Sequence, residues 1–94
     1  IAEHGGFYYI GSDNDPILVI DISNLSVVNR IPVPNNSGVR DMIFFNQGQT
    51  MVAASASRDA LLLFERVQGS PGNYKLSYEQ KVNCQHTHGL LYAN

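Results

Sequence analysis

Two histidines in the last part of the sequence, His86 and His88, are separated by a single residue. Side chains at positions i and i+2 of a β-strand share a face, so a strand here would present both imidazoles together. Imidazoles are common ligands of Zn²⁺ and Cu²⁺, and His4 is a candidate third ligand. The spacing suggests a divalent metal site, and the alternative is a pair of ordinary polar residues at a strand entrance.

Two short polar segments form a second candidate site, because they occupy corresponding places between apolar runs. Residues 13–15 read Asp-Asn-Asp, and residues 57–59 read Ser-Arg-Asp. Carboxylate and amide oxygens suit Ca²⁺, although the glycine and glutamate spacing of an EF-hand loop is missing. Asp and Asn also cap turns routinely, so solvated turns are the alternative. The candidate ligand-binding residues in these loops are Asp13, Asn14, Asp15, Arg58 and Asp59.

Motifs for covalent or phosphate chemistry are absent from the sequence. It contains no Gly-x-Ser-x-Gly nucleophile elbow and no glycine-rich phosphate loop between a strand and a helix. Cys84 is the single cysteine, which excludes an intrachain disulfide and any Cys-x-x-Cys metal or redox site.

Composition limits the class of protein. Apolar residues make up 44% of the 94 residues and charged residues 15%, which is typical of one small folded domain. The net charge is −2 and the six Lys and Arg residues are scattered, unlike the basic stripe of a nucleic-acid-binding protein. No apolar run approaches the roughly 18 residues that a membrane-spanning helix needs. The chain begins with Ile1 rather than Met, which predicts a processed or excised segment.

Two N-glycosylation sequons indicate where the protein is located. They are Asn24-Leu25-Ser26 and Asn35-Asn36-Ser37, and both fall in segments expected to be loops. If Asn24 and Asn35 carry glycans, the protein is secreted or exposed at a cell surface; the alternative is that both sequons occur by chance.

Apolar residues come in short runs, rich in β-branched and aromatic side chains and broken by Gly, Pro, Asn, Asp or Ser, which predicts an all-β antiparallel meander. Two of the runs carry apolar residues on both faces and are expected between two layers. The run at 74–82 alternates, with Tyr74, Leu76 and Tyr78 on one face, which is typical of an edge strand. The predicted strands are Phe7–Ile10, Ile17–Ile22, Val27–Val33, Val39–Phe45, Met51–Ala56, Ala60–Val67, Tyr74–Val82 and His88–Ala93.

An internal repeat organises these strands. The segment YYIGSDNDPILVID (8–21) aligns with MVAASASRDALLLFE (51–65) with one insertion, and VRDMIFFN (39–46) aligns with THGLLYAN (87–94). Arg30-Ile31 then matches Lys81-Val82. Each repeat holds four strands over a few tens of residues, the size of one β-propeller blade.

The repeat resembles the YVTN family of β-propeller repeats. The residues that carry the resemblance are ILVID (17–21), VVNRIPV (27–33) and the Asn-Gln-Gly turn at 46–48. The second copy departs from the family pattern, because Glu65 replaces the aspartate and residues 68–73 form a longer loop. The resemblance implies about two four-stranded blades with their innermost strands at 39–45 and 88–93. An eight-stranded β-sandwich is the alternative fold.

The resemblance also implies how the chain is divided. Residues 1–38 are expected to form a first blade that lacks its innermost strand, residues 39–85 a complete second blade, and residues 86–94 the innermost strand of a further blade. Because the two defects are complementary, residues 86–93 are predicted to pair with the strand at 7–12 of a neighbouring copy or of adjoining sequence.

The function expected from these observations is a non-enzymatic propeller repeat module in an extracellular assembly. Its partners would be copies of itself or adjoining blades, with a carbohydrate or a protein as ligand and neither nucleic acid nor a membrane span. The alternative that the resemblance implies is part of a lactonase-like or metal-dependent hydrolase, with His86 and His88 in a site at the channel.

Overall fold

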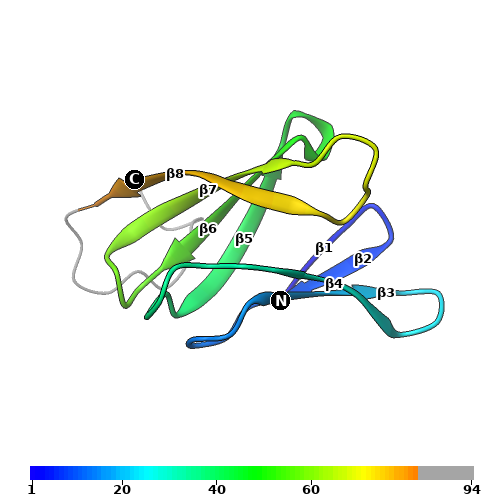
Figure 1. The fold of residues 1–94 in the computed structure, drawn as a ribbon, viewed down its shortest axis with the longest axis horizontal. Helices are drawn as coiled ribbons and strands as arrows, with labels where there is room; N and C mark the ends of the chain where they lie inside the picture. Colours follow the sequence, from blue (N-terminus) through cyan, green and yellow to red (C-terminus); the bar gives the residue numbers. More distant parts are fainter. Residues whose placement is uncertain (83–94) are drawn as a thin grey trace.

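The computed structural model describes residues 1–82, which form two antiparallel four-stranded sheets and confirm the all-β prediction (Figure 1). In each sheet the strands lie side by side in chain order. The N-terminal sheet consists of β1 (Ala2–His4), β2 (Phe7–Ile10), β3 (Ile17–Asp21) and β4 (Ser26–Ile31). The C-terminal sheet consists of β5 (Val39–Phe45), β6 (Thr50–Ser55), β7 (Ala60–Arg66) and β8 (Tyr74–Lys81), with a short 3-10 turn, η1 (Asn46–Gly48), between β5 and β6.

The predicted strand runs are confirmed for the described residues. The runs at 7–10 and 39–45 are strands with the predicted bounds, and the other five agree to within about two residues. The predicted strand at 88–93 lies outside the described residues. In the described part of the chain, no helix is long and apolar enough to cross a membrane.

The N-terminal sheet has four strands, contrary to the expectation that residues 1–38 lack one, because β1 pairs with β2 along its edge. Ala2 pairs with Tyr9, Glu3 with Tyr8, and His4 with Phe7. The sequence Ala-Glu-His has neither the apolar alternation nor the β-branched residues of a typical strand, so its strand conformation comes from pairing with β2. The edge of β2 that was expected to accept residues 86–93 of another copy is therefore already paired.

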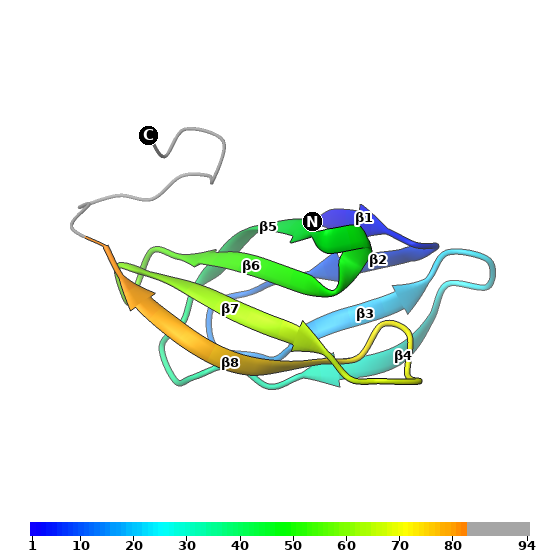
Figure 2. The same ribbon diagram turned by 90° about the horizontal axis from the view of Figure 1, so that it is seen from above.

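The two sheets pack face to face around a common core, with the C-terminal sheet lying over the N-terminal one (Figures 1 and 2). The side chains between the sheets form what we call the inner faces. They are almost entirely apolar and most are fully buried, which supplies the main favourable free energy of folding. The inner faces consist mainly of Tyr9, Ile17, Val19 and Ile31 from the N-terminal sheet and Met42, Met51, Ala53, Leu62, Phe64 and Tyr74 from the C-terminal sheet.

The opposite side of each sheet, its outer face, is also apolar. In the N-terminal sheet the outer face carries Tyr8, Ile10, Leu18 and Ile20, all of them half-buried. In the C-terminal sheet it carries the half-buried residues Ile43, Val52, Leu61 and Leu63 together with the exposed Phe45 and Tyr78. Central strands that are apolar on both sides are typical of sheets covered on both sides.

A β-bulge in each sheet determines which side chains of the fourth strand, β4 or β8, lie on the inner face and which lie on the outer face. In the C-terminal sheet the register shifts between Leu63, which pairs with Tyr78, and Phe64, which pairs with Leu76. Because the extra residue reverses the alternation, Tyr78 lies on the outer face and is 55% exposed, whereas Leu76 lies on the inner face. The prediction that Tyr78 shares a face with Tyr74 and Leu76 is therefore wrong.

The sheets are not parallel layers of constant separation. They approach most closely at β1 and β5. At the outermost strands a largely apolar hollow of about 380 Å³ lies between residues 32–34, which follow β4, and the beginning of β8. The two sheets therefore diverge from their first strands toward their fourth strands.

Candidate functional site

The polar segments singled out in the sequence meet at one end of the molecule, which we call the loop end. It is formed by the β2–β3 loop (residues 11–16), the connection between the sheets (residues 32–38) and the β6–β7 turn (residues 56–59). The backbone N–H groups of Gly38 and Val39 donate to the carbonyls of Asp13 (2.8 Å) and Ser12 (3.1 Å). The N–H of Asn36 donates to Oδ1 of Asn14 at 3.1 Å. The Asp-Asn-Asp segment therefore anchors the connection between the sheets.

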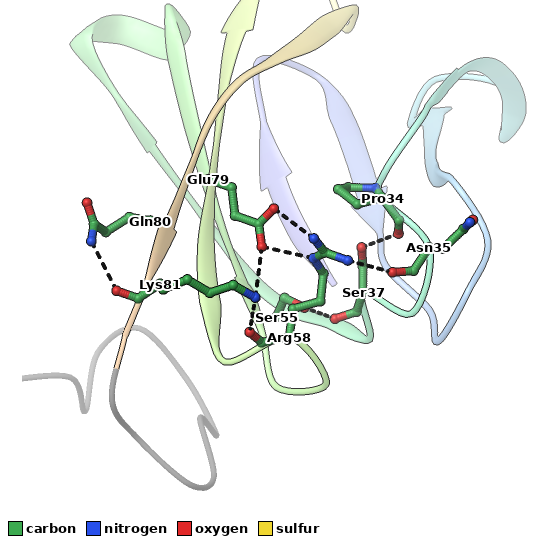
Figure 3. A network of polar contacts seen from close by, with 8 residues as sticks. All are labelled: Pro34, Asn35, Ser37, Ser55, Arg58, Glu79, Gln80 and Lys81. Carbon is green, nitrogen blue, oxygen red and sulfur yellow. Dashed lines mark hydrogen bonds and ion pairs between the residues drawn. The ribbon is translucent and has the colours of Figure 1, made fainter.

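Arg58 is the centre of the loop-end network (Figure 3). Its Nε and Nη2 atoms each donate to a different carboxylate oxygen of Glu79 at 2.9 Å, which is the bidentate geometry of a strong ion pair. Its Nη1 donates to the carbonyl oxygen of Asn35 at 2.9 Å. One guanidinium thus ties β8, the β6–β7 turn and the connection between the sheets together.

The ionisation of the Arg58–Glu79 pair follows from these bonds. Hydrogen bonding to Arg58 is the main reason that the pKa of Glu79 lies below its ordinary value, and Lys81 contributes in the same direction. Hydrogen bonding to Glu79 raises the pKa of Arg58. Lys81 also reaches Glu79 at 3.3 Å and donates to the backbone carbonyl of Arg58 at 2.8 Å. The carboxylate is therefore held ionised by two cations.

Two buried serines complete the network, and sequence reasoning missed both. The hydroxyl of Ser55 in β6 donates to the carbonyl oxygen of Ser37, and the hydroxyl of Ser37 donates to the carbonyl oxygen of Pro34. Ser37 and Ser55 are fully buried, so these bonds satisfy groups that water cannot reach. The acceptor of Ser55 lies 18 residues away, so no local pattern identifies that bond, whereas the acceptor of Ser37 lies only three residues before it.

The acidic candidates do not gather around a common point. Asp13, Asp15 and Asp59 are exposed, and Asp13 makes a 3.9 Å contact with Arg40 in which both side chains are largely exposed. Within residues 1–82 no group of three His, Cys, Asp or Glu side chains is placed to hold a metal ion. The described loop end is therefore held together by ion pairs and by hydrogen bonds that involve the backbone.

Of the three histidines proposed as metal ligands, the structure places His4, while His86 and His88 lie outside the described residues. The imidazole of His4 stacks on Phe44 with a centroid distance of 4.7 Å and an interplanar angle of 14°. Its Nε2 lies against Gly48, so closely that a Cβ atom at this position would clash with the ring. Packing between β1 and β5 accounts for the position of this ring.

A cavity of about 230 Å³, which the sequence analysis missed, lies at the opposite end of the interface between the sheets. Its lining includes His4, Gln47, Arg66 and the rings of Tyr9 and Tyr74. Burial raises the pKa values of both tyrosines, so their phenols stay protonated at neutral pH. A guanidinium, an imidazole and an amide are groups that can hydrogen-bond a small anion.

The backbone beside this cavity adopts an uncommon conformation. Asn46 and Gln47 have φ angles of 52° and 56°, in the left-handed region, and Gly48 follows with a φ of 85°. The hydroxyl of Tyr74 donates to the carbonyl oxygen of Gly48 at 2.5 Å and fixes this turn from β8. The turn that the sequence analysis matched to a family motif is therefore held by a side chain of β8 that is 26 residues away in the sequence.

Both sequon asparagines are exposed, and neither lies on an outer face of a sheet. Asn24 sits in the β3–β4 turn, where its Oδ1 accepts hydrogen bonds from the N–H and the hydroxyl of Ser26 at 3.0 and 2.7 Å. Asn35 sits in the connection between the sheets. Glycosylation stays a prediction, and the positions of both side chains are sterically open to it.

Comparison with known proteins adds no assignment to this geometry: no family model, curated protein or solved structure matches the chain.

Proposed function

We propose that the chain is a non-enzymatic repeat module of the β-propeller type, whose two sheets are successive blades. One observation carries this proposal: both outer faces are as rich in apolar residues as the buried inner faces. A sheet of this kind needs a layer on each side, and blades in a propeller cover one another in that way.

The divergence of the sheets supports blades over a β-sandwich. Successive blades of a propeller are closest at their innermost strands, and β1 and β5 are the closest strands of the two sheets. A closed sandwich would also leave polar residues on the outer sides of its sheets, and here these sides carry Leu18, Ile20, Leu61 and Leu63.

The organisation of the polar residues supports a structural or binding role. The connection between the sheets is held by the side chains of Arg58, Glu79, Ser37 and Ser55. These side chains are therefore already engaged in hydrogen bonds to the backbone and in an ion pair. Such a rigid framework presents its loops as a surface for a carbohydrate or protein ligand. With Asn24 and Asn35 exposed, we place the module in an extracellular assembly of copies or adjoining blades.

Light scattering of the 94-residue chain tests the proposal. Two blades cannot close a ring, since propellers need about four to eight, so the chain is expected to associate. Three copies would provide six blades. A folded, soluble monomer at high concentration would contradict the proposal, because its outer faces would then be stable in water.

Metal content separates this function from the hydrolase alternative. The module requires no metal, whereas a hydrolase that uses His86 and His88 should retain a transition metal through mild purification. A stoichiometric metal that is lost in a His88→Ala variant would favour the hydrolase.

A further inference from the structure

The two sheets follow the same pairing plan, strand by strand. In the N-terminal sheet Tyr9 pairs with Val19, and in the C-terminal sheet Val52 pairs with Leu63. Directly after Val19, and again directly after Leu63, the register with the outermost strand shifts at a bulge. The bulges align the sheets independently of side-chain similarity, so Tyr9 corresponds to Val52 and Val19 corresponds to Leu63.

Corresponding residues lie on opposite faces with respect to the contact between the sheets. Val19 is buried on the inner face of its sheet, whereas Leu63 lies on the outer face. Leu18 lies on an outer face, and the residue that corresponds to it, Leu62, is buried on the inner face. Two units stacked front to back in the same orientation produce this exchange. A two-fold axis between the sheets would instead place corresponding residues on the same kind of face.

We propose that a second copy of the chain continues this front-to-back stacking. The outer face of the C-terminal sheet of one copy packs against the outer face of the N-terminal sheet of the next copy. This inference rests on the proposed function and names both the partner and the mating faces.

The argument is continuity with the contact inside the chain. On the outer face of the C-terminal sheet, Leu61 and Leu63 stand where the internal contact has Ile17 and Val19. On the outer face of the N-terminal sheet, Leu18 and Ile20 stand where the internal contact has Leu62 and Phe64. Joining these two faces therefore repeats an apolar contact that the chain already makes.

The rim of the proposed contact also carries a charged residue at the position where the internal contact has one, but the charge is positive instead of negative. Arg30 pairs with Leu18 as Glu79 pairs with Leu62, so the two charged residues correspond. At the internal contact Glu79 binds Arg58 at the loop end. Arg30 and Asp15 line a hollow of about 360 Å³ at the corresponding end of the outer face of the N-terminal sheet. An apolar centre with a charged residue beside the loops is thus common to both contacts.

Stacking of this kind is heterologous, because it joins two different faces. It leaves one unmatched face at each end of a stack, so it grows into a filament or closes into a ring. It does not require residues 86–93 to displace β1, which already occupies the edge of β2.

Two single-face variants test the proposal by complementation. Leu18→Lys places a charge on the outer face of the N-terminal sheet, and Leu63→Lys places one on the outer face of the C-terminal sheet. Light scattering should find the wild type associated and each variant alone at the monomer mass of 10.4 kDa. An equimolar mixture should contain a dimer of twice that mass and nothing larger. In the mixture, the C-terminal outer face of Leu18→Lys can join the N-terminal outer face of Leu63→Lys. The two faces that remain free in this dimer are the ones that carry the introduced lysines, so no further copy can add.

A matched control is Gln68→Lys, which adds the same charge in the exposed β7–β8 loop and should associate like the wild type. Circular dichroism must show wild-type strand content for every variant, and Leu18→Ser with Leu63→Ser repeats the test with a smaller perturbation. Self-association of either single variant, or a mixture that stays monomeric, overturns the front-to-back pairing while leaving the proposed function intact. A monomeric wild type overturns both.

Discussion

At the scale of single residues, the hydroxyl of Tyr74 makes a contact whose loss is simple to measure. It donates to the buried carbonyl of Gly48, so Tyr74→Phe leaves that acceptor without its partner. We expect the free energy of unfolding to fall by about 1–3 kcal/mol, the usual cost of an unsatisfied buried polar group. Urea denaturation followed by circular dichroism measures the change.

Tyr78→Phe is the matched control, because the Tyr78 hydroxyl donates to Gln80 at the surface, where water can replace it. Its effect should stay within about 0.5 kcal/mol. Equal losses for the two variants would show that the Gly48 contact does not stabilise the turn.

The Arg58–Glu79 pair predicts a dependence of stability on pH. The folded protein lowers the pKa of Glu79 below its ordinary value of 4.5, so the carboxylate contributes stability above that value. The contribution disappears as the pH falls through the lowered pKa of the folded state. The difference in unfolding free energy between the wild type and Arg58→Gln, measured from pH 7 to pH 2, should therefore shrink on acidification to the constant part that comes from the Asn35 bond.

The comparison isolates Glu79 from the other acids. Asp21 also has a lowered pKa, which comes from the hydroxyl and the N–H of Ser23, but the Arg58→Gln variant keeps those bonds. The bond from Arg58 to Asn35 has no titratable acceptor, so its loss offsets the two curves equally at every pH. Curves that run parallel from neutral to acid pH would contradict the assignment.

The sequence could identify Arg58 as a site residue but not its role. Arg58 occurs in a polar turn, and that pattern suggested a ligand-binding loop. Its partner Glu79 is 21 residues away on another strand, and the acceptor at Asn35 is 23 residues away. Only the packed arrangement of three segments brings them together, so no local pattern distinguishes a structural ion pair from a ligand site.

At the scale of the strands, the repeat provides pairs of positions with the same chemistry and different surroundings. Leu62 is fully buried between the sheets, and Leu62→Ala should lower the free energy of unfolding by about 2–5 kcal/mol at any protein concentration. Leu18 occupies the corresponding position on an outer face. The loss of unfolding free energy for Leu18→Ala should be smaller in dilute solution. It should grow with protein concentration, because association then buries that face.

Thermal unfolding over a hundredfold range of protein concentration measures both effects. The difference in Tm between the wild type and Leu62→Ala should be constant, and the difference for Leu18→Ala should widen. A constant, small difference for Leu18→Ala would indicate that the outer face of the N-terminal sheet stays in water.

Most strands could be predicted from the sequence because their own side chains carry the signal. Runs such as 17–21 and 60–66 are apolar and bounded by turn residues, so burial and local preference agree. β1 was missed because Ala-Glu-His has no such preference and forms a strand through its partner. The predicted face of Tyr78 was wrong because a bulge shifts the register between β7 and β8. The regular alternation of the sequence gives no sign of that shift.

At the scale of the whole molecule, polar and apolar surfaces are segregated. The loop end gathers the ion pairs and hydrogen bonds that fix the connection between the sheets, and the two outer faces carry the apolar side chains. Contacts with further copies and contacts with a ligand would therefore use different surfaces. This separation allows the chain to extend by stacking while its loops stay accessible.

Glycosylation tests the same separation. Asn24 lies in the β3–β4 turn and Asn35 in the connection between the sheets, so neither glycan would be attached to a strand that forms an outer face. In material secreted by a eukaryotic cell, enzymatic deglycosylation should lower the intact mass. The variants Asn24→Gln and Asn35→Gln should each lack the mass of one glycan.

The association state should be the same before and after deglycosylation, because the stacking faces carry neither asparagine. An unchanged mass would remove the argument for an extracellular location. A change in association on deglycosylation would instead show that a glycan reaches the contact, which is incompatible with stacking through the outer faces alone.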